Sequence, residues 1–253
     1  MINWKDIKEQ LITFLKQEVN KTGLKKVTVG LSGGLDSAVV AVLCKEAFGD
    51  NLNCILMPSQ FSSKASIDDA KELCEKFDIK YETVDIEPMI SAYIDKMDND
   101  DLRIGNFSAR MRMSVLYDIS SREKSLVVGT SNKSELLLGY GTIFGDIACA
   151  INPIGQMYKS DEYEFAKYLG VTNSIINKAP SADLWEGQSD ENELGYSYAQ
   201  MDSVLKPLID QEKSKEELIK QGFDKNLIDM LEKRIKANAF KGKLPTIAKI
   251  NWS

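Results

Sequence analysis

Short β-rich runs alternate with helical segments along the first half of this chain, and this alternation restricts the possible folds more than any other feature. The β-rich runs are residues 26–31, 53–57, 81–84 and 126–128. The segments with apolar residues at helical spacing are residues 36–48, 66–77 and 108–122. Because strands separated by helices usually pair in parallel, the pattern predicts an α/β fold with an open parallel sheet flanked by helices.

Other segments complete the predicted organisation. Helical spacing predicts an amphipathic N-terminal helix at about 2–22, a helix at 160–169 and two charged helices at about 213–239, with a break at Gly222. Between them, frequent glycines after Gly129 are typical of functional loops. A length of 253 residues suits one large α/β domain, so we interpret residues 1–253 as a single domain.

Composition excludes several kinds of chemistry. The chain contains no histidine, which removes the usual general base and every Ser-His or Cys-His pair. Its four cysteines, Cys44, Cys54, Cys74 and Cys149, have neither metal-like nor CxxC spacing, so we expect buried or free reduced thiols. The chemistry must therefore depend on carboxylates, lysines, arginines, backbone amides and a hard metal ion.

Charge and hydropathy limit the possible partners. The net charge of −6 argues against non-specific binding to nucleic acid. The N-terminus lacks the apolar core of a signal peptide, and no uncharged stretch approaches membrane-spanning length. We therefore expect a cytoplasmic protein that does not bind membranes.

The most informative motif is Gly30-Leu31-Ser32-Gly33-Gly34-Leu35-Asp36-Ser37, which lies between a predicted strand and the next helix. Two glycines allow the backbone to approach an anion, and the amides at a helix N-terminus attract negative charge. Walker A is absent from the chain, and GxGxxG does not occur here. The motif resembles the SGGxDS loop of the PP-loop ATP pyrophosphatases, which release pyrophosphate and transfer AMP. The alternative is a turn in which Ser and Asp only cap a helix.

Two carboxylates indicate a magnesium site. Asp36 would repel phosphate oxygens unless a cation lay between them, and Mg²⁺ binds phosphates with one or two protein carboxylates. Glu135 follows another predicted strand, at the sheet edge where ligands of such folds bind. The capping-box spacing of Asn132 and Glu135 leaves a second interpretation open, in which Glu135 only secures a helix start.

Further motifs are similar, in order and over nearly the whole chain, to those of the bacterial NAD synthetases. They are Asn106-Phe107-Ser108-Ala109-Arg110-Met111-Arg112, 129–135, Gly145-Asp146, Asn152-Pro153-Ile154-Gly155, Lys159, 180–184, 188–191 and Glu193-Leu194-Gly195. The resemblance implies a Rossmann-like adenine nucleotide α-hydrolase (PP-loop) fold. It also implies that ATP and Mg²⁺ support the amidation of deamido-NAD by ammonia through an adenylylated intermediate. A homodimer is implied as well.

The resemblance also implies roles for individual residues. Asp36 and Glu135 match the magnesium ligands, and the residues that match ATP contacts are Gly30, Leu31, Ser32, Gly33, Gly34, Leu35, Asp36, Ser37, Thr130, Lys159 and Ser181. Arg110 and the pair Phe240-Lys241 match substrate-binding positions, and residues 181–195 match a mobile acidic loop. Many relatives carry His-Lys in place of Phe240-Lys241, and a lysine and an aspartate near Ile143 and Ala150. Asp146 is a candidate proton acceptor for the attacking ammonia, or alternatively a loop cap.

Competing functions remain open from the sequence. Another PP-loop ligase, such as a tRNA thiolase or a GMP-synthetase-like amidotransferase subunit, would share the SGGxDS motif. A non-catalytic nucleotide-binding sensor would share the fold, although intact Asp36 and Glu135 argue against a decayed site. Because the resemblance extends from near the N-terminus to Lys241, we expect no amidase segment and therefore use of free ammonia.

Overall fold

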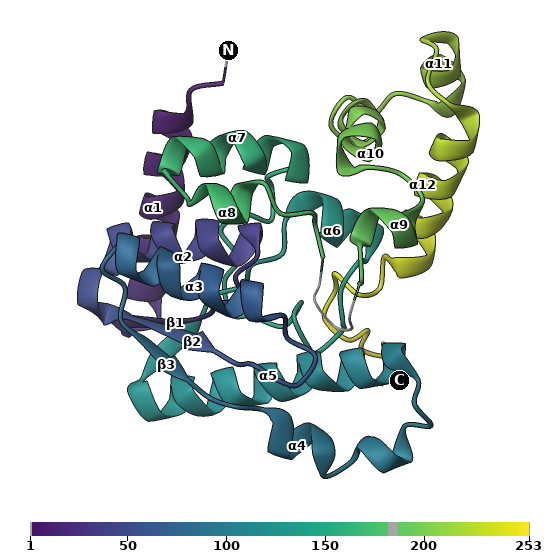
Figure 1. Cartoon of the computed structure of the whole chain (residues 1–253). Helices are drawn as coiled ribbons and strands as arrows, with labels where there is room; N and C mark the ends of the chain where they lie inside the picture. The colour runs from purple at the N-terminus through teal and green to yellow at the C-terminus, as the bar shows by residue number, and fades with distance from the viewer. Residues whose placement is uncertain (1, 182–186, 253) are drawn as a thin grey trace.

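A four-stranded parallel sheet lies at the centre of the computed structural model, which describes residues 2–181 and 187–252 (Figure 1). The strands are β1 (Lys26–Gly30), β2 (Leu52–Leu56), β3 (Tyr81–Thr83) and β4 (Ser125–Val127). Their order is β3-β2-β1-β4, and each neighbouring pair is parallel. The predicted fold class is confirmed, and each predicted strand end lies within one residue of the observed end.

The central strand β1 is buried on both faces. Val27, Thr28 and Val29 are fully buried, as expected for a strand covered by helices above and below. The hydroxyl of Thr28 forms a 2.6 Å hydrogen bond with that of Ser125, so this buried polar pair is satisfied. The strand ends at Gly30, which places the following loop at the carboxyl edge of the sheet.

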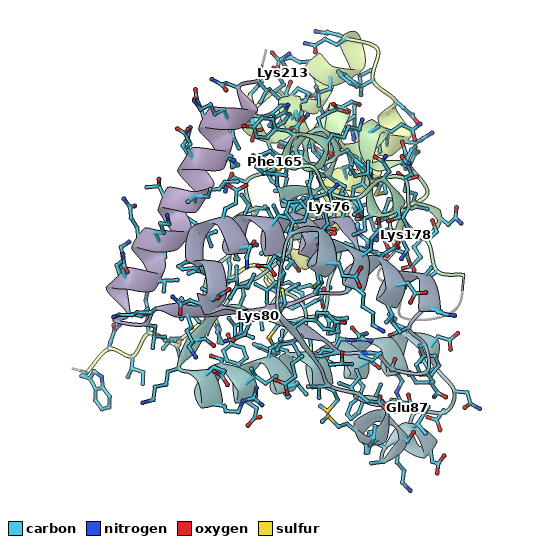
Figure 2. All side chains as sticks on the ribbon, turned by 60° about the vertical axis from the view of Figure 1, so that its left-hand side comes forward. Lys76, Lys80, Glu87, Phe165, Lys178 and Lys213 are labelled. Atoms are coloured by element: carbon cyan, nitrogen blue, oxygen red, sulfur yellow. The ribbon has the colours of Figure 1, made fainter. Side chains whose placement is uncertain are left out.

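One face of the sheet is covered by α2 (Leu35–Phe48) and α3 (Lys64–Lys76), with α1 (Trp4–Lys21), α7 (Lys159–Leu169) and α8 (Asn173–Ile176) packed outside them (Figure 1). Because α2 lies between the sheet and α1, it is apolar on nearly all sides. Phe165 of α7, labelled in Figure 2, is fully buried, and its ring centroid lies 5.6 Å from that of Trp4.

The opposite face is covered by α5 (Asp101–Glu123), with the short α4 (Glu87–Ser91) beside it. The predicted start of this helix at residue 108 was wrong, since α5 begins two turns earlier. Gly105 weakens the helical pattern in those turns, whereas the cap on Asp100 is clear: its side chain accepts from the amide of Arg103 at 3.1 Å.

Helices from the second half of the chain form a separate layer with its own apolar core. Its helices are α6 (Lys133–Leu138), α9 (Asp190–Leu194), α10 (Tyr198–Leu205), α11 (Lys215–Lys220) and α12 (Lys225–Asn238), and a π-helical turn covers Lys206–Asp210. The break at Gly222 between the two charged helices is confirmed, since the φ angle there is +91°. The capping-box spacing of Asn132 and Glu135 allowed a helix start where α6 lies, and the structure confirms it. No helix was predicted for α10, because a helix this short shows little periodicity.

The thiols behave as the sequence predicts. All four cysteines are free, with Cys44, Cys54 and Cys74 buried and Cys149 half-buried. Burial raises the pKa of each of these thiols. Across residues 2–181 and 187–252, no helix combines the length and apolar character that crossing a membrane requires.

Candidate active site

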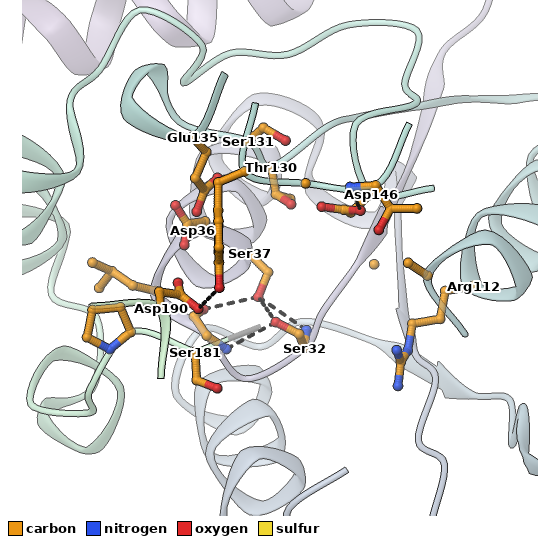
Figure 3. A pocket seen from close by; sticks show the side chains of 18 of the residues that line it. Ser32, Asp36, Ser37, Arg112, Thr130, Ser131, Glu135, Asp146, Ser181 and Asp190 are labelled. Carbon is orange, nitrogen blue, oxygen red and sulfur yellow. Dashed lines mark hydrogen bonds between the residues drawn. The ribbon is translucent and has the colours of Figure 1, made fainter. Parts of the chain in front are cut away.

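A cavity of about 600 Å³ opens at the carboxyl edge of the sheet, within the usual size range of small-molecule sites (Figure 3). Its walls come from the loop between β1 and α2, one face of α5, the segment after β4 and the C-terminal helices. The charged residues that line it are Asp36, Glu135, Asp146, Asp190, Glu193, Arg112, Lys159, Lys178, Arg234 and Lys241.

The motif at residues 30–37, the PP-loop, connects β1 to the N-terminus of α2. Hydrogen bonds between Ser32 and Ser37 hold its two ends together. The Ser37 hydroxyl accepts from the Ser32 amide at 3.2 Å and donates to the Gly34 carbonyl at 3.0 Å. Gly34 is the N-cap of α2, and no side chain caps this helix start. The sequence alternative, in which Ser and Asp merely cap the helix, is therefore wrong. The helix N-terminus instead borders the cavity, which suits an anion.

Gly33 fixes the shape of this loop. Its φ angle is +82°, in the region that favours glycine. A Cβ atom added there would lie 2.0 Å from the backbone oxygen of Ser66, much closer than any real contact. The loop therefore lies directly against the start of α3, and any larger residue would displace it.

Asp36 belongs to a buried ion-pair network. Its carboxylate pairs with the Lys159 ammonium, and its second oxygen accepts from the Asn132 side-chain amide at 2.7 Å. Burial acts to raise the pKa of Asp36, but Lys159 and these hydrogen bonds hold it below its usual range. Burial likewise acts to lower the pKa of Lys159, yet the surrounding carboxylates, Asp36 first, raise it well above normal. The pair is therefore charged at neutral pH.

Glu135 caps α6 and also lines the cavity. Its carboxylate accepts from the Asn132 amide at 3.1 Å, and the Asn132 side chain accepts from the Glu135 amide at 3.0 Å. This reciprocal capping box confirms the helix-start interpretation, but it does not exclude the metal role, since the carboxylate also borders the cavity. Burial, and then the charge of Asp36, raise the pKa of Glu135 well above its usual range.

Asp36 and Glu135 offer a donor set that suits Mg²⁺. The two carboxylates come from the first turns of α2 and α6 and lie close together in Figure 3. Mg²⁺ is typically held by one or two carboxylates together with substrate phosphates and water. In the part of the chain that the structure describes, no group of three or more His, Cys, Asp or Glu side chains could hold a metal ion. The pair therefore fits a cation that arrives with a nucleotide.

The unpredicted helix α10 holds Lys159 in place. Asp202 of α10 accepts from the Ser134 hydroxyl at 2.6 Å and from the Ser160 amide at 2.8 Å. The Ser134 hydroxyl accepts in turn from the Lys159 amide at 3.0 Å. Because Asp202 is only 1% exposed, these bonds link α6, α7 and α10 rigidly.

The far end of the cavity contains Asp146 and Lys241. Asp146 accepts from the Thr142 amide at 2.7 Å, which confirms its interpretation as a loop cap. Its carboxyl still borders the cavity, and burial raises its pKa. The Lys241 ammonium donates to the carbonyls of Gly139 at 2.8 Å and Gly141 at 3.0 Å. Lys241 therefore ties the C-terminal segment to this glycine-rich loop.

The structure gathers most of the predicted site residues around one cavity. Those that line it are Gly30, Leu31, Ser32, Gly34, Leu35, Asp36, Ser37, Thr130, Glu135, Asp146, Lys159, Ser181 and Lys241. Gly33 shapes the loop from behind, whereas Arg110 and Phe240 lie outside the lining. Arg110 is exposed on α5 and donates to the Ile143 carbonyl at 3.3 Å, and Phe240 is 60% exposed.

Several lining residues were missed from the sequence. Arg112 faces the cavity from α5 and donates to the Met57 carbonyl at 3.1 Å. Its helical spacing with Ala109 and Leu116, which also line the cavity, was a usable signal. Lys178, labelled in Figure 2, reaches the cavity and donates to the Ser66 hydroxyl. Nothing in its sequence context distinguished it from a surface lysine.

The acidic loop is only partly described. Residues 182–186 of the predicted loop at 181–195 lie outside the described residues. Ser181 borders the cavity before them, and Asp190 and Glu193 border it after them. The Tyr140 hydroxyl donates to Asp190 at 3.0 Å and contacts Glu193 at 3.2 Å, so the second half of this loop is anchored to the loop after α6.

Comparison with known proteins gives a consistent result. The family model described as NAD synthase matches residues 7–245. An NH(3)-dependent NAD(+) synthetase of Wolinella succinogenes is 53% identical over 242 residues, covering 95% of this chain and 94% of that protein. The solved NH3-dependent NAD synthetase from Campylobacter jejuni, in complex with the nitrate ion, has a TM-score of 0.85 at 44% identity. The match covers 98% of this chain and 100% of that chain. An NMN synthetase from Francisella tularensis has a TM-score of 0.88 at 29% identity. The match covers 99% of this chain and 100% of that chain.

Proposed function

Because the chain belongs to the NAD synthase family, we infer that it is a ligase that amidates deamido-NAD with ammonia and consumes ATP. NAD, AMP and pyrophosphate are the products. The observation that carries this proposal is the meeting of the PP-loop, Lys159 and two carboxylates, Asp36 and Glu135, in one cavity. Family membership also argues against the other PP-loop ligases, the tRNA thiolases and GMP-synthetase-like subunits.

The first step activates an unreactive carboxylate. A nicotinate oxygen attacks the α-phosphorus of ATP, and the bond between that phosphorus and the pyrophosphate oxygen breaks. The amides of the PP-loop and the Lys159 ammonium stabilise the charge of the departing pyrophosphate. Asp36 and Glu135 would hold Mg²⁺, which when bound neutralises phosphate charge. No protein nucleophile is needed, which agrees with a chain without histidine.

The second step forms the amide. Ammonia attacks the carbonyl carbon of the adenylylated dinucleotide, and AMP leaves with the former carboxylate oxygen. The nitrogen must lose a proton as the bond forms. Asp146 is the proposed acceptor, since it borders the cavity and burial raises the pKa of its carboxyl toward neutral pH, where a general base works best.

A second candidate substrate is the acid form of NMN. The likeness to an NMN synthetase covers nearly the whole chain. The departures at Ile143, Ala150 and Phe240 also concern how a dinucleotide would be held. Higher identity to the NAD synthetases favours the dinucleotide as the substrate of this chain.

Exchange of labelled pyrophosphate into ATP tests the proposal. With Mg²⁺ and without ammonia, exchange is expected only when deamido-NAD is present, because adenylylation is reversible and precedes amide formation. The acid form of NMN is the parallel arm, and faster exchange with it would replace the dinucleotide as substrate. A nucleotide-binding sensor would give no exchange with either compound, and that result would refute the assignment.

We also propose that the enzyme is a homodimer and works in the cytoplasm, where free thiols stay reduced. One side of α5 packs on β1 and β4, while Tyr117 on its other side is 42% exposed. Phe144, 65% exposed, lies beside Ile143, whose carbonyl accepts from Arg110 of α5. Sedimentation is expected to show twice the chain mass of 28.3 kDa. A fully active species of 28.3 kDa alone would contradict the dimer.

A further inference from the structure

Glu162 is a buried carboxylate that neither step of the proposed reaction uses. It lies one helical turn after Lys159 on α7 and is 0% exposed. Neither of its carboxylate oxygens has a hydrogen-bond partner of normal geometry in the part of the chain that the structure describes. Its Oε2 lies 3.5 Å from the Lys159 ammonium. Buried polar groups are rarely left so poorly satisfied, so this position requires an explanation.

The Lys159 ammonium lies between two carboxylates with different exposure. Asp36 borders the cavity, and 20% of its side chain is exposed. Glu162 does not border the cavity and lies behind the lysine. In the structure, Lys159 makes its close ion pair with Asp36 and only a longer one with Glu162. The lysine therefore occupies one oxygen of a proposed magnesium ligand.

A divalent cation on Asp36 would compete with this arrangement. One carboxylate oxygen of Asp36 accepts from the Asn132 side-chain amide, and the other pairs with the Lys159 ammonium. A cation that binds Asp36 would therefore compete with Lys159 for the second oxygen. If Lys159 lost Asp36 and had no other anion, an ammonium with only 4% side-chain exposure would be left unpaired. Burial, and then the charge of Asp36, raise the pKa of Glu162 well above its usual range, in agreement with the closer pairing of Lys159 with Asp36 in this structure.

We propose that Glu162 is a positioning residue that accepts the Lys159 ammonium when Mg²⁺ takes Asp36, and so keeps the lysine beside the departing pyrophosphate. The inference rests on the proposed function, because it assumes a nucleotide and Mg²⁺ at Asp36. It assigns Glu162 no contact with either substrate. Without Glu162, Lys159 would remain on Asp36, and both the metal and the phosphates would have to displace it.

The test compares Glu162→Gln with Glu164→Gln, a matched control on the same helix whose side chain is 59% exposed. Binding of a non-hydrolysable ATP analogue is followed by calorimetry over a Mg²⁺ series, without deamido-NAD. Glu162→Gln is expected to raise the half-saturating Mg²⁺ concentration roughly tenfold, within the range usual for coupled sites. The control is expected to match the wild type.

The analogue is also titrated in EDTA, where two explanations predict different results. If Glu162 acted only through its negative charge, its removal would tighten metal-free binding of the anionic analogue. The exchange of Lys159 predicts unchanged metal-free binding, because without a cation the lysine stays on Asp36 in the wild type and in the variant alike. Unchanged Mg²⁺ dependence, or tighter metal-free binding, would overturn the proposal.

A second variant and the behaviour of the wild type separate the failure of this proposal from misfolding and from failure of the proposed function. Glu162→Asp keeps the charge but shortens the side chain, and it is expected to raise the Mg²⁺ requirement less than Glu162→Gln. If Glu162→Gln does not fold, wild-type Mg²⁺ dependence in Glu162→Asp would count against the role. Failure of the wild type to bind the analogue with Mg²⁺ would instead count against the proposed function itself.

Discussion

Replacing Glu135 by glutamine is expected to lower the rate of pyrophosphate exchange by about 10²–10³-fold, the usual cost of removing a transition-state charge stabiliser. Glutamine at the third position of a helix still completes a capping box, so the bonds between Asn132 and residue 135 persist. If Glu135 acted only as a cap, the variant would therefore stay active. The exchange assay at saturating Mg²⁺ separates the two roles.

Asp36→Asn is expected to reduce exchange by a similar factor and also to lower stability. The substitution removes the close partner of the Lys159 ammonium, although Glu162 remains 3.5 Å away. We expect a loss of about 1–3 kcal/mol in the free energy of unfolding, less than for a fully buried pair that loses its partner, because 20% of the Asp36 side chain is exposed. Thermal and denaturant unfolding measure this loss, and Glu164→Gln is the control.

Near-normal exchange by both variants with Mg²⁺ would show that the metal assignment is wrong. Loss of folding in Asp36→Asn would leave Glu135→Gln as the decisive variant, since its capping bonds are retained. Circular dichroism of each variant establishes whether the helices are intact before rates are compared.

The PP-loop was predictable because its chemistry lies in consecutive residues. Ser32 and two glycines between a β-rich run and a helical run, with Ser37 at the start of that helical run, indicate an anion site from the sequence alone. The place of Glu135 in the site was also predictable, since residues that follow parallel strands meet at one edge of the sheet. The spacing of Asn132 and Glu135 indicated their capping box, but the sequence could not show that Asn132 also contacts Asp36, because that contact spans 96 residues.

Other parts of the site depend on which side of a helix faces inward. Glu162 and Glu164 look alike in the sequence, yet one is 0% exposed and the other has a 59% exposed side chain. Arg110 and Arg112 lie two residues apart on α5, and only Arg112 borders the cavity. Such differences arise from the packing of whole helices, which periodicity in one segment does not determine.

The position of Lys159 illustrates long-range control of the site. Without family resemblance it would be read as a surface lysine, but it is 3% exposed. Its helix is held through Asp202 of α10, a helix too short for its period to be recognised. The same network places Glu162 behind the lysine, so the charge balance of the PP-loop is set by elements more than 120 residues away in sequence.

Ammonium salt is expected to support NAD formation by the purified chain, whereas ammonia-free glutamine is not. Enzymes that use glutamine commonly need a cysteine whose pKa is lowered by a nearby cation or helix N-terminus. All four cysteines of the sequence belong to the described residues, and none borders the described cavity. Burial raises the pKa of Cys74 to about 11 and that of Cys54 well above its usual range, the opposite of activation.

The nitrogen assay contains its own control. Reactions with ATP, Mg²⁺ and deamido-NAD receive either ammonium salt, glutamine, or glutamine with an added glutaminase. The added enzyme is expected to restore NAD formation, which would show that release of ammonia is the step this chain does not perform. The family likeness to NH3-dependent synthetases supports the same expectation. Equal rates from glutamine alone and from ammonium would refute ammonia dependence even if NAD synthesis itself were observed, because the chain would then have to release ammonia from glutamine itself.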